Sequence, residues 1–414
     1  MTERQAAYIA RYEKAKVAYD TKGMADVLCD WRDNFQVDEI ADMPDEYYDR
    51  YKIIQYQVFK ELLAHNGARA RYYIDHLPKG KAAIKHLGHP YYYGLSYYED
   101  GDYQTAAAYF REHLDHPLWL HNELGIFFLA NTLAYLGDYD EAEEFYQKAI
   151  GYKKSFSEAV ENLAAAKQGK PPQHRYPWGS YLAMKGKSIF DIPIFINSRD
   201  RVECLKRLVA WLTQSGYRRI YILDQNSTYQ PLLDYYAEID GKLATVIRFS
   251  RNIGHMAVFK SDILEILEID TPYIYTDSDV VPEDTTPVDL IEVFYQILVS
   301  CPFFRKVSLG IKYSDITFYN KKEAMKVEAQ KENTPILPNV YIGAYDTTFA
   351  LYGNHRFYSV EEAAIVRIEG AEGLHLPWYY GEVLPPDEEY YVDHADRVVS
   401  TFSRGYFADL ANKQ

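Results

Sequence analysis

The stretch YIYTDSDVVP, residues 273–282, decides the fold because two carboxylates directly follow a run of residues with strand character. Residues 273–275 are aromatic or β-branched, as in the core of a sheet, and a proline lies on either side of the element. We therefore predict a buried strand that runs into Asp277 and Asp279.

The two aspartates are candidates for a metal site. Asp277 and Asp279 are two residues apart, so in an extended strand their side chains lie on one face. The carboxyl ends of strands are also where open α/β sheets place their ligands. Carboxylate oxygens at that position predict a site for Mn²⁺ or Mg²⁺ that binds a diphosphate. The alternative is an ordinary turn, since Asp-Ser-Asp is common turn chemistry.

Length and composition limit the classes of protein. A chain of 414 residues with 48% hydrophobic and 25% charged residues predicts two globular domains with full cores. The net charge of -15 argues against a nucleic-acid partner, which needs a basic face. Cys29, Cys204 and Cys301 are too few and too scattered for a disulfide framework or a zinc site. Without an apolar leader or transmembrane segment, we expect a cytoplasmic protein and leave attachment to a membrane surface open.

The first half of the chain has a helical pattern with an internal repeat. Residues 97–103, which contain Gly-Asp-Tyr, are echoed by residues 135–139 at an offset of 36 residues. This is close to the tetratricopeptide period of about 34 residues. The segment resembles tetratricopeptide repeats, with Gly-Asp-Tyr in the turn between paired helices, then an alanine and an aromatic residue. The copy at 129–150 is the closer match.

These signals predict a tetratricopeptide-like helical domain over residues 1–170. Residues 157–166 are expected to cap the stack, and residues 171–188 to form a linker rich in proline and glycine. Such a stack presents a groove that could hold a peptide or a glycan. Two alternatives stay open, namely that the helices only pack on the second half or that they mediate self-association.

The second half alternates strands and helices, which implies a parallel sheet with its functional loops at one edge. The expected strands are 189–198, 217–224, 244–250 and the strand that carries Asp277, and the expected helices begin near 202, 229 and 256.

Four landmarks in this half resemble the family 2 glycosyltransferases, which have a GT-A fold. Asn197 and Arg199 resemble the family's Asn-Arg, residues 224–228 its Asp-Asp-Gly-Ser-Thr loop, residues 252–254 its Asn-x-Gly, and residues 277–279 its Asp-x-Asp metal motif. Residues 225 and 226 depart from the pattern, as does Lys260. The resemblance implies a multidomain α plus α/β protein whose residues 189–414 form a Rossmann-like GT-A domain.

The implied activity is transfer of a sugar, most simply a hexose, from a nucleotide-diphosphate sugar, with a UDP-sugar favoured. The acceptor would be a glycan, as in polysaccharide biosynthesis, a lipid-linked glycan or a protein. The resemblance favours inversion, and retention stays open. It implies donor contacts from Asn197, Arg199, Asp224, Asn226, Asn252, Lys260, Asp277 and Trp378, and metal contacts from Asp277, Asp279 and His375.

An inverting transfer also needs a base that takes the proton of the acceptor hydroxyl. Asp346 lies among apolar and hydroxylated residues in the segment 341–353, where partial desolvation would raise the pKa of a carboxyl group. It is our candidate base. Glu361, Glu362 and Glu369 are competitors, and a structural role for Asp346 is the alternative.

The segment 373–380 carries the last candidates. His375 resembles a late histidine that completes the metal site in several GT-A enzymes, and Trp378 could be a platform for a sugar ring. A structural histidine is the alternative to a ligand.

Two rival functions remain. A sugar nucleotidyltransferase would need a glycine-rich loop after the first strand. The loop here, INSRDR at 196–201, has no glycine. The other rival is a non-catalytic scaffold in which only the repeats act.

Overall fold

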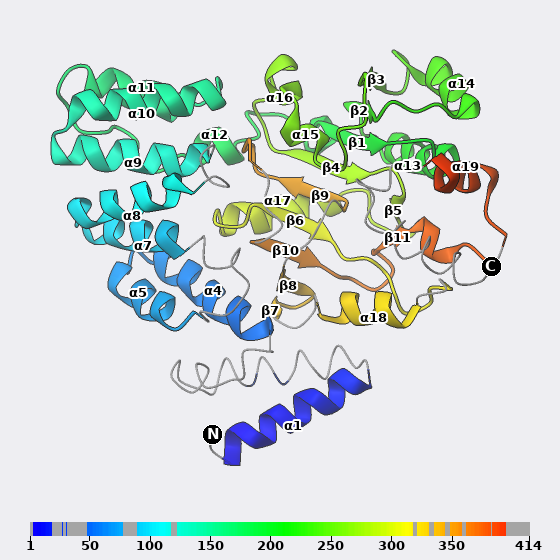
Figure 1. Ribbon diagram of the computed structural model, residues 1–414, viewed down its shortest axis with the longest axis horizontal. Helices are drawn as coiled ribbons and strands as arrows, with labels where there is room; N and C mark the ends of the chain where they lie inside the picture. The colour runs from blue at the N-terminus through cyan, green and yellow to red at the C-terminus, as the bar shows by residue number, and fades with distance from the viewer. Residues whose placement is uncertain are drawn as a thin grey trace.

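A computed structural model shows a stack of helices beside a domain built on a mixed β-sheet (Figure 1). It describes residues 3–18, 27, 30, 48–77, 89–116, 122–317, 321–330, 335–343, 348–357, 362–381 and 383–394. The predicted multidomain α plus α/β class is confirmed. The boundaries at 170 and 188 stay predictions.

From α4 onward the helices of the first half pair with their neighbours in sequence, and Figure 1 shows them stacked beside one edge of the second domain, with α1 apart from the stack. They are α1 (Glu3–Val17), α4 (Tyr48–Leu63), α5 (Gly67–Asp75), α7 (His89–Asp100), α8 (Tyr103–Asp115), α9 (Glu123–Leu136), α10 (Tyr139–Tyr152) and α11 (Ser157–Ala166). Helix α11 confirms the predicted capping helix.

The repeat residues do what their pattern predicts. Gly137 ends α9 with φ 89°, a left-handed conformation that glycine adopts without a steric cost. After each turn the alanine and the aromatic residue are fully buried, as Ala106 and Phe110 in one copy and Ala142 and Tyr146 in the other. The turn and the small-plus-aromatic pair therefore fix the packing of both helix pairs.

The linker is bound across the first helices of the repeats. Asn162 of α11 accepts from the backbone N–H groups of residues 173 and 174 at 2.9 and 2.8 Å and donates to the His174 carbonyl at 2.8 Å. Asn131 of α9 donates to the same carbonyl at 2.9 Å, and the Tyr98 hydroxyl of α7 donates to the Arg175 carbonyl at 2.9 Å. The short helix α12 (Trp178–Leu182) follows.

The sheet of the second domain has nine strands in the order β3-β2-β1-β4-β9-β6-β10-β8-β7, and β5 pairs with β11 in a separate small sheet. The first four strands of that order are parallel, which confirms the prediction, whereas β9 is antiparallel to both of its neighbours. The strands are β1 (Ile194–Ser198), β2 (Ile220–Asp224), β3 (Thr245–Arg248), β4 (Tyr273–Asp277), β5 (Val280–Pro282), β6 (Lys306–Leu309), β7 (Pro335–Leu337), β8 (Val340–Gly343), β9 (Ala350–Tyr352), β10 (Ala363–Val366) and β11 (Gly373–His375).

Four expected elements are shorter than predicted, since the strands expected at 217–224 and 244–250 are Ile220–Asp224 and Thr245–Arg248. The expected helix at 256–268 is broken into α15 (Ala257–Lys260) and α16 (Ile263–Ile266), because Ser261 is extended and its hydroxyl donates to the Ala257 carbonyl at 2.7 Å. The expected strand at 189–198 begins with a 3-10 turn, η1 (Ile189–Asp191).

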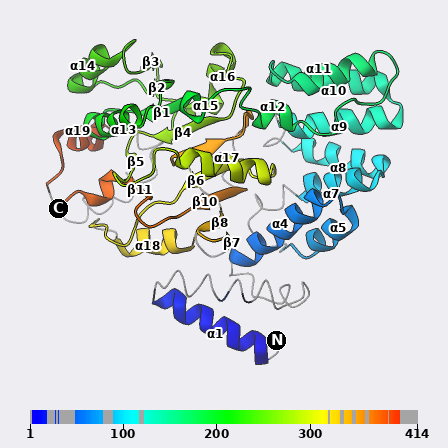
Figure 2. The ribbon, with the colours of Figure 1, turned by 180° about the vertical axis from the view of Figure 1, so that it is seen from behind.

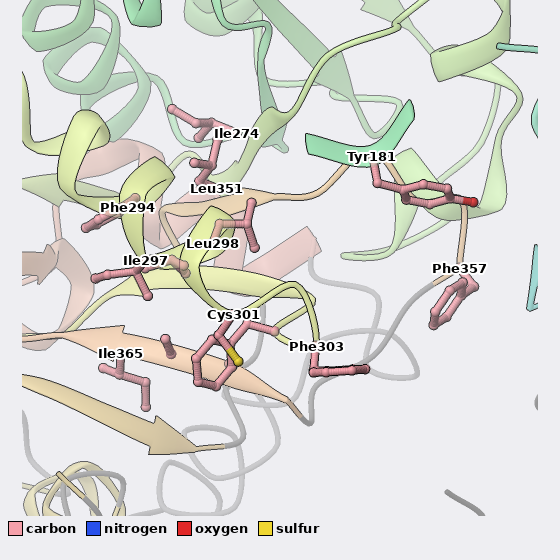
Figure 3. Close-up of a cluster of buried hydrophobic side chains, with 14 of the residues drawn as sticks. Tyr181, Ile274, Phe294, Ile297, Leu298, Cys301, Phe303, Leu351, Phe357 and Ile365 are labelled. Carbon is pink, nitrogen blue, oxygen red and sulfur yellow. The ribbon is translucent and has the colours of Figure 1, made fainter. Parts of the chain in front are cut away.

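Longer helices lie around the sheet. They are α13 (Val202–Gln214), α14 (Gln230–Ile239), α17 (Leu290–Ser300), α18 (Lys321–Gln330) and α19 (Pro386–His394), with the 3-10 turn η2 (Leu376–Tyr379). Helix α17 lies across the sheet in Figure 2 and contacts β6 and β9. Its buried Phe294 and Leu298 belong to the same hydrophobic cluster as Leu351 of β9 and Ile365 of β10 (Figure 3).

The two domains share a buried interface. Phe59 of α4 packs against Phe303 and Phe304 of the sheet domain, with ring centroids 5.5 and 5.8 Å apart. Glu123 of α9 accepts from the backbone N–H of Arg356 at 2.5 Å, and burial raises the pKa of this carboxyl group. Aromatic packing and a hydrogen bond therefore join the repeats to the sheet directly.

Candidate functional site

The candidate site begins where β1 and β4 end side by side. Asn197 and Asp277 are register partners, and the Asn197 amide donates to Asp277 Oδ1 at 2.9 Å. Asn197 Oδ1 is buried and has no hydrogen-bond partner among the residues described. The strand ends thus leave an acceptor that a hydroxyl group of a ligand could satisfy.

Asp279 lies beside this pair in an ionic cluster. Arg201, just before α13, donates to Asp279 Oδ2 at 2.6 Å and to both oxygens of Glu388 at 2.5 and 2.7 Å. The side chains of Arg201, Asp279 and Glu388 are 16%, 8% and 8% exposed, so all three charges are largely removed from water. Two carboxylates share one guanidinium, which leaves the cluster with a net negative charge.

His375 lies near the same oxygen of Asp279 that Arg201 contacts. Its Nε2 lies 3.7 Å from Asp279 Oδ2, and its ring centroid lies 4.8 Å from that of Trp378. Burial lowers the pKa of His375, and the charge of Asp279 partly opposes this shift. Trp378 is 4% exposed, so its proposed contact with a sugar stays a prediction.

The side chains at this edge are of the chemical types that bind a divalent cation. Carboxylate and imidazole groups are ligands of Mn²⁺, and Mg²⁺ prefers the carboxylates. In the described ranges, however, no three His, Cys, Asp or Glu side chains come together to hold a metal ion. Arg201 instead occupies one oxygen of Asp279, so a cation bound by Asp279 would compete with this guanidinium.

Asp224, at the end of β2, does not present a free oxygen to a ligand. It is fully buried, and Oδ1 accepts from the Tyr236 hydroxyl at 3.1 Å. Its Oδ2 accepts from Arg248 Nε at 2.9 Å, and the backbone N–H of Ser227 lies 3.2 and 3.3 Å from the two oxygens. The predicted direct contact of Asp224 with a nucleoside is therefore not supported by this geometry, and the exposed group is Arg248.

Asp200 holds the loops after β1 and β2 together. It has φ 57° and accepts from the backbone N–H groups of Thr228 and Tyr229 at 2.7 and 2.9 Å. We did not identify Asp200 from the sequence, although a short polar side chain is one of the few that tolerates a left-handed backbone.

The remaining predicted donor contacts lie in neighbouring loops. Asn226 is exposed with φ 58°, next to Gln225, whose side chain accepts from the backbone N–H of Ile253 at 2.9 Å. Asn252 accepts from the N–H of Gly254 at 2.9 Å, and Lys260 donates to the carbonyl of residue 253 at 3.3 Å. Their contacts with a donor stay predictions.

Helix α19 covers the edge formed by these loops (Figure 1). Besides the pair of Glu388 with Arg201, Asp387 accepts from the backbone N–H of Glu203 at 2.9 Å. The hydroxyl groups of Tyr390 and Thr228 are 3.1 Å apart, and Arg199 donates to the carbonyl of residue 394 at 3.0 Å.

Two of the four candidate bases lie in the described part of the structure, and two do not. Asp346 and Glu361 lie outside the described residues. Glu362 accepts from Arg305 at 2.9 Å and from the Tyr92 hydroxyl, so it belongs to the interface with the repeats rather than to the strand edge. Glu369 lies in a turn after β10, and no contact supports its role as a base.

One comparison with known proteins identifies a family in the first domain. Residues 126–157 match the tetratricopeptide repeat family, which confirms the predicted second copy of the repeat. Among proteins of curated function, none matches this sequence. None of the described helices is both long and apolar enough to cross a membrane.

One solved structure with similarity is a lysine-to-methionine mutant of the Thermobaculum terrenum O-GlcNAc transferase. It has 12% sequence identity and a TM-score of 0.28, over 53% of this chain and 44% of that one. This chain therefore spans less than half of the length of that protein, and similarity at this level carries no argument about fold or activity.

Proposed function

We propose that this chain is a glycosyltransferase that moves a hexose from a nucleotide-diphosphate sugar to a glycan, lipid-linked or protein acceptor. The observation that carries the proposal is the Asn197–Asp277 pair beside the Asp279–Arg201–Glu388 cluster at the carboxyl ends of β1 and β4. The strand order reverses between these two strands, and open α/β sheets bind ligands at such a point. The GT-A assignment belongs to the same proposal.

The chain's own residues supply contacts for both halves of a nucleoside diphosphate. Asn197 Oδ1 is an acceptor for a ribose hydroxyl. Arg201 has five N–H groups, of which three bond to Glu388 and Asp279. The other two have no partner among the described residues and could donate to diphosphate oxygens. The contacts with Glu388 and Asp279 thus fix the orientation of the Arg201 guanidinium and leave N–H groups that could bind a ligand.

A divalent cation at Asp277 and Asp279, with His375 beside them, is part of this proposal. Such an ion would stabilise the charge that develops on the leaving diphosphate. The net negative charge of the Asp279–Arg201–Glu388 cluster supports it, because an anionic donor needs more positive charge than Arg201 alone provides.

We propose inversion, with Asp346 as the base that takes the proton of the acceptor hydroxyl. This assignment rests on the sequence around residue 346. A retaining reaction would make the Asp346→Asn variant active, and the anomeric configuration of the product would show it directly.

The proposal is tested by thermal denaturation with nucleoside diphosphates, with and without Mn²⁺, because a ligand that binds only the folded state raises Tm. We expect one nucleoside diphosphate to raise the Tm of the wild type only with Mn²⁺. Asp277→Asn, which keeps the shape of the side chain, should lose this response. Asp284→Asn is the matched control, because its side chain is 87% exposed.

An absent response to every nucleotide would contradict the proposal and leave the scaffold alternative, in which only the repeats act. Equal responses of Asp277→Asn and the wild type would also contradict it, because the ligand would then bind elsewhere.

A further inference from the structure

Arg248 is a half-exposed side chain that the protein holds in a fixed orientation. Its Nε donates to the buried Asp224 at 2.9 Å, and its Nη2 donates to the carbonyl of Ser227 at 2.9 Å. The side chain is 48% exposed, while that of Asp224 is 0% exposed. A buried carboxylate therefore anchors a guanidinium whose far end faces solvent.

The free end of Arg248 carries a pair of donors. A guanidinium has five N–H groups, and the contacts with Asp224 and Ser227 use one on Nε and one on Nη2. The part of the chain that is described offers no partner to Nη1. One N–H of Nη1 and one of Nη2 therefore point outward side by side, in the geometry that binds two adjacent acceptors.

The position of Arg248 matches the base of a nucleotide whose diphosphate lies at Asp277. Arg248 ends β3 and Asp277 ends β4, with β2 and β1 between them. Three steps between neighbouring strands amount to about 14 Å along the sheet edge. This is the scale of an extended nucleoside diphosphate, with Asn197 lying between its two ends.

Arg248 offers a base hydrogen-bond donors at this position, where a free carboxylate would offer acceptors. A carboxylate only accepts hydrogen bonds, whereas a guanidinium only donates them. Because Asp224 has both oxygens occupied, the base meets donors from Arg248 instead. Uracil has no two adjacent acceptors on one edge, since an N–H separates its two carbonyls. Guanine presents O6 and N7 together, and among base edges this is the one that arginine contacts most often in DNA recognition.

We propose that Arg248 selects a guanosine diphosphate sugar as the donor. This inference rests on the glycosyltransferase function proposed above, and it replaces the UDP-sugar that the sequence alone favours. Recognition of guanine through O6 and N7 also discriminates against adenine, whose N6 is a donor that would face another donor.

The test is calorimetric titration of the full chain with GDP, UDP, CDP and ADP in the presence of Mn²⁺. We expect GDP to bind at least about tenfold more tightly than UDP and ADP, the scale of one bidentate contact. CDP is the stricter comparison, because cytosine also has two adjacent acceptors, O2 and N3, and GDP should still bind more tightly than CDP. Arg248→Lys keeps a charge next to Asp224 but loses the paired donors. It should weaken GDP binding about ten- to hundredfold and leave UDP binding nearly unchanged.

Arg218→Lys is the control, because Arg218 pairs with Asp191 at 2.7 Å at the opposite end of β2. It should not change the affinity for GDP. Tighter binding of UDP, CDP or ADP than of GDP by the wild type would overturn the assignment of the base, even if Arg248→Lys fails to fold. An equal loss of all four nucleotides in Arg248→Lys would overturn it too.

The outcomes separate this inference from the proposed function. If UDP binds most tightly and Asp277→Asn loses it, the glycosyltransferase proposal stands and the role of Arg248 fails. If none of the four nucleotides binds, both fail.

Discussion

Arg201 and Asp279 form a buried ion pair, with Nη1 of the arginine 2.6 Å from Oδ2 of the aspartate. The pair joins the start of α13 to the loop after β4, and Glu388 of α19 completes it from a third segment of the chain. One guanidinium thus ties together three elements at the proposed donor site.

Removal of this guanidinium should destabilise the fold strongly. In Arg201→Met, Asp279 and Glu388 would remain buried without a counter-charge, which typically costs about 3 to 5 kcal/mol. Urea denaturation should show a loss of that size in the free energy of unfolding. Arg207→Met is the control, because Arg207 and Asp284 are 43% and 87% exposed and 3.7 Å apart. That variant should lose less than about 1 kcal/mol. Equal losses in the two variants would contradict the prediction.

Helix α19 should depend on Glu388 for its attachment. In Glu388→Gln the bidentate, charge-assisted contact with Arg201 is lost, so residues 386–394 should open more often. Hydrogen exchange followed by mass spectrometry should show faster exchange of that segment. Glu389→Gln changes an exposed neighbour and should leave the exchange rate as it is in the wild type. Unchanged exchange in Glu388→Gln would mean that other contacts hold the helix.

The aromatic contact between the domains should contribute to stability. Phe59 is fully buried against Phe303 and Phe304, and truncation of a buried phenylalanine to alanine costs about 3 to 5 kcal/mol. We expect a loss of this size in the free energy of unfolding of Phe59→Ala. Leu63→Ala, on the same helix but 40% exposed, should lose much less. Similar losses in the two variants would show that the contact of Phe59 with the sheet domain does not stabilise the fold.

His355 should make the fold sensitive to acid. Burial and the charge of Arg305 lower its pKa from 6.5 to about 3, although carbonyl groups 2.8 and 2.9 Å from its two ring nitrogens favour the protonated ring. Below about pH 6.5 the unfolded chain therefore binds a proton that the folded chain does not bind until about pH 3. Stability should fall by up to about 1.4 kcal/mol per pH unit in this window.

Urea denaturation of the wild type and of His355→Gln between pH 4 and pH 7 would check this prediction. The variant should show the shallower dependence on pH. A slope as steep as that of the wild type would assign the acid sensitivity to other groups.

The sequence predicted the elements better than it predicted their contacts. The Gly-Asp-Tyr turn and the strand before Asp277 were visible because local periodicity and turn residues determine them. Arg201 and Glu388 were not, because they are 187 residues apart and only the packing of α19 brings them together. The hydrogen bond of Asp224 with Arg248 could not be predicted from the sequence for the same reason, since Arg248 comes from another strand.

The contacts of Asn131 and Asn162 with residues 173–175 have a consequence for partner proteins. These asparagines bind backbone groups, so the chain itself acts as the peptide that the repeats hold. Because this peptide is attached to the same molecule, its effective concentration at the repeats is of millimolar order. A free peptide could bind these asparagines only by displacing the tethered residues 173–175. A partner that binds weakly therefore cannot displace residues 173–175 from this surface. A partner that binds tightly would displace them and so break contacts of the segment that joins the repeats to the sheet domain.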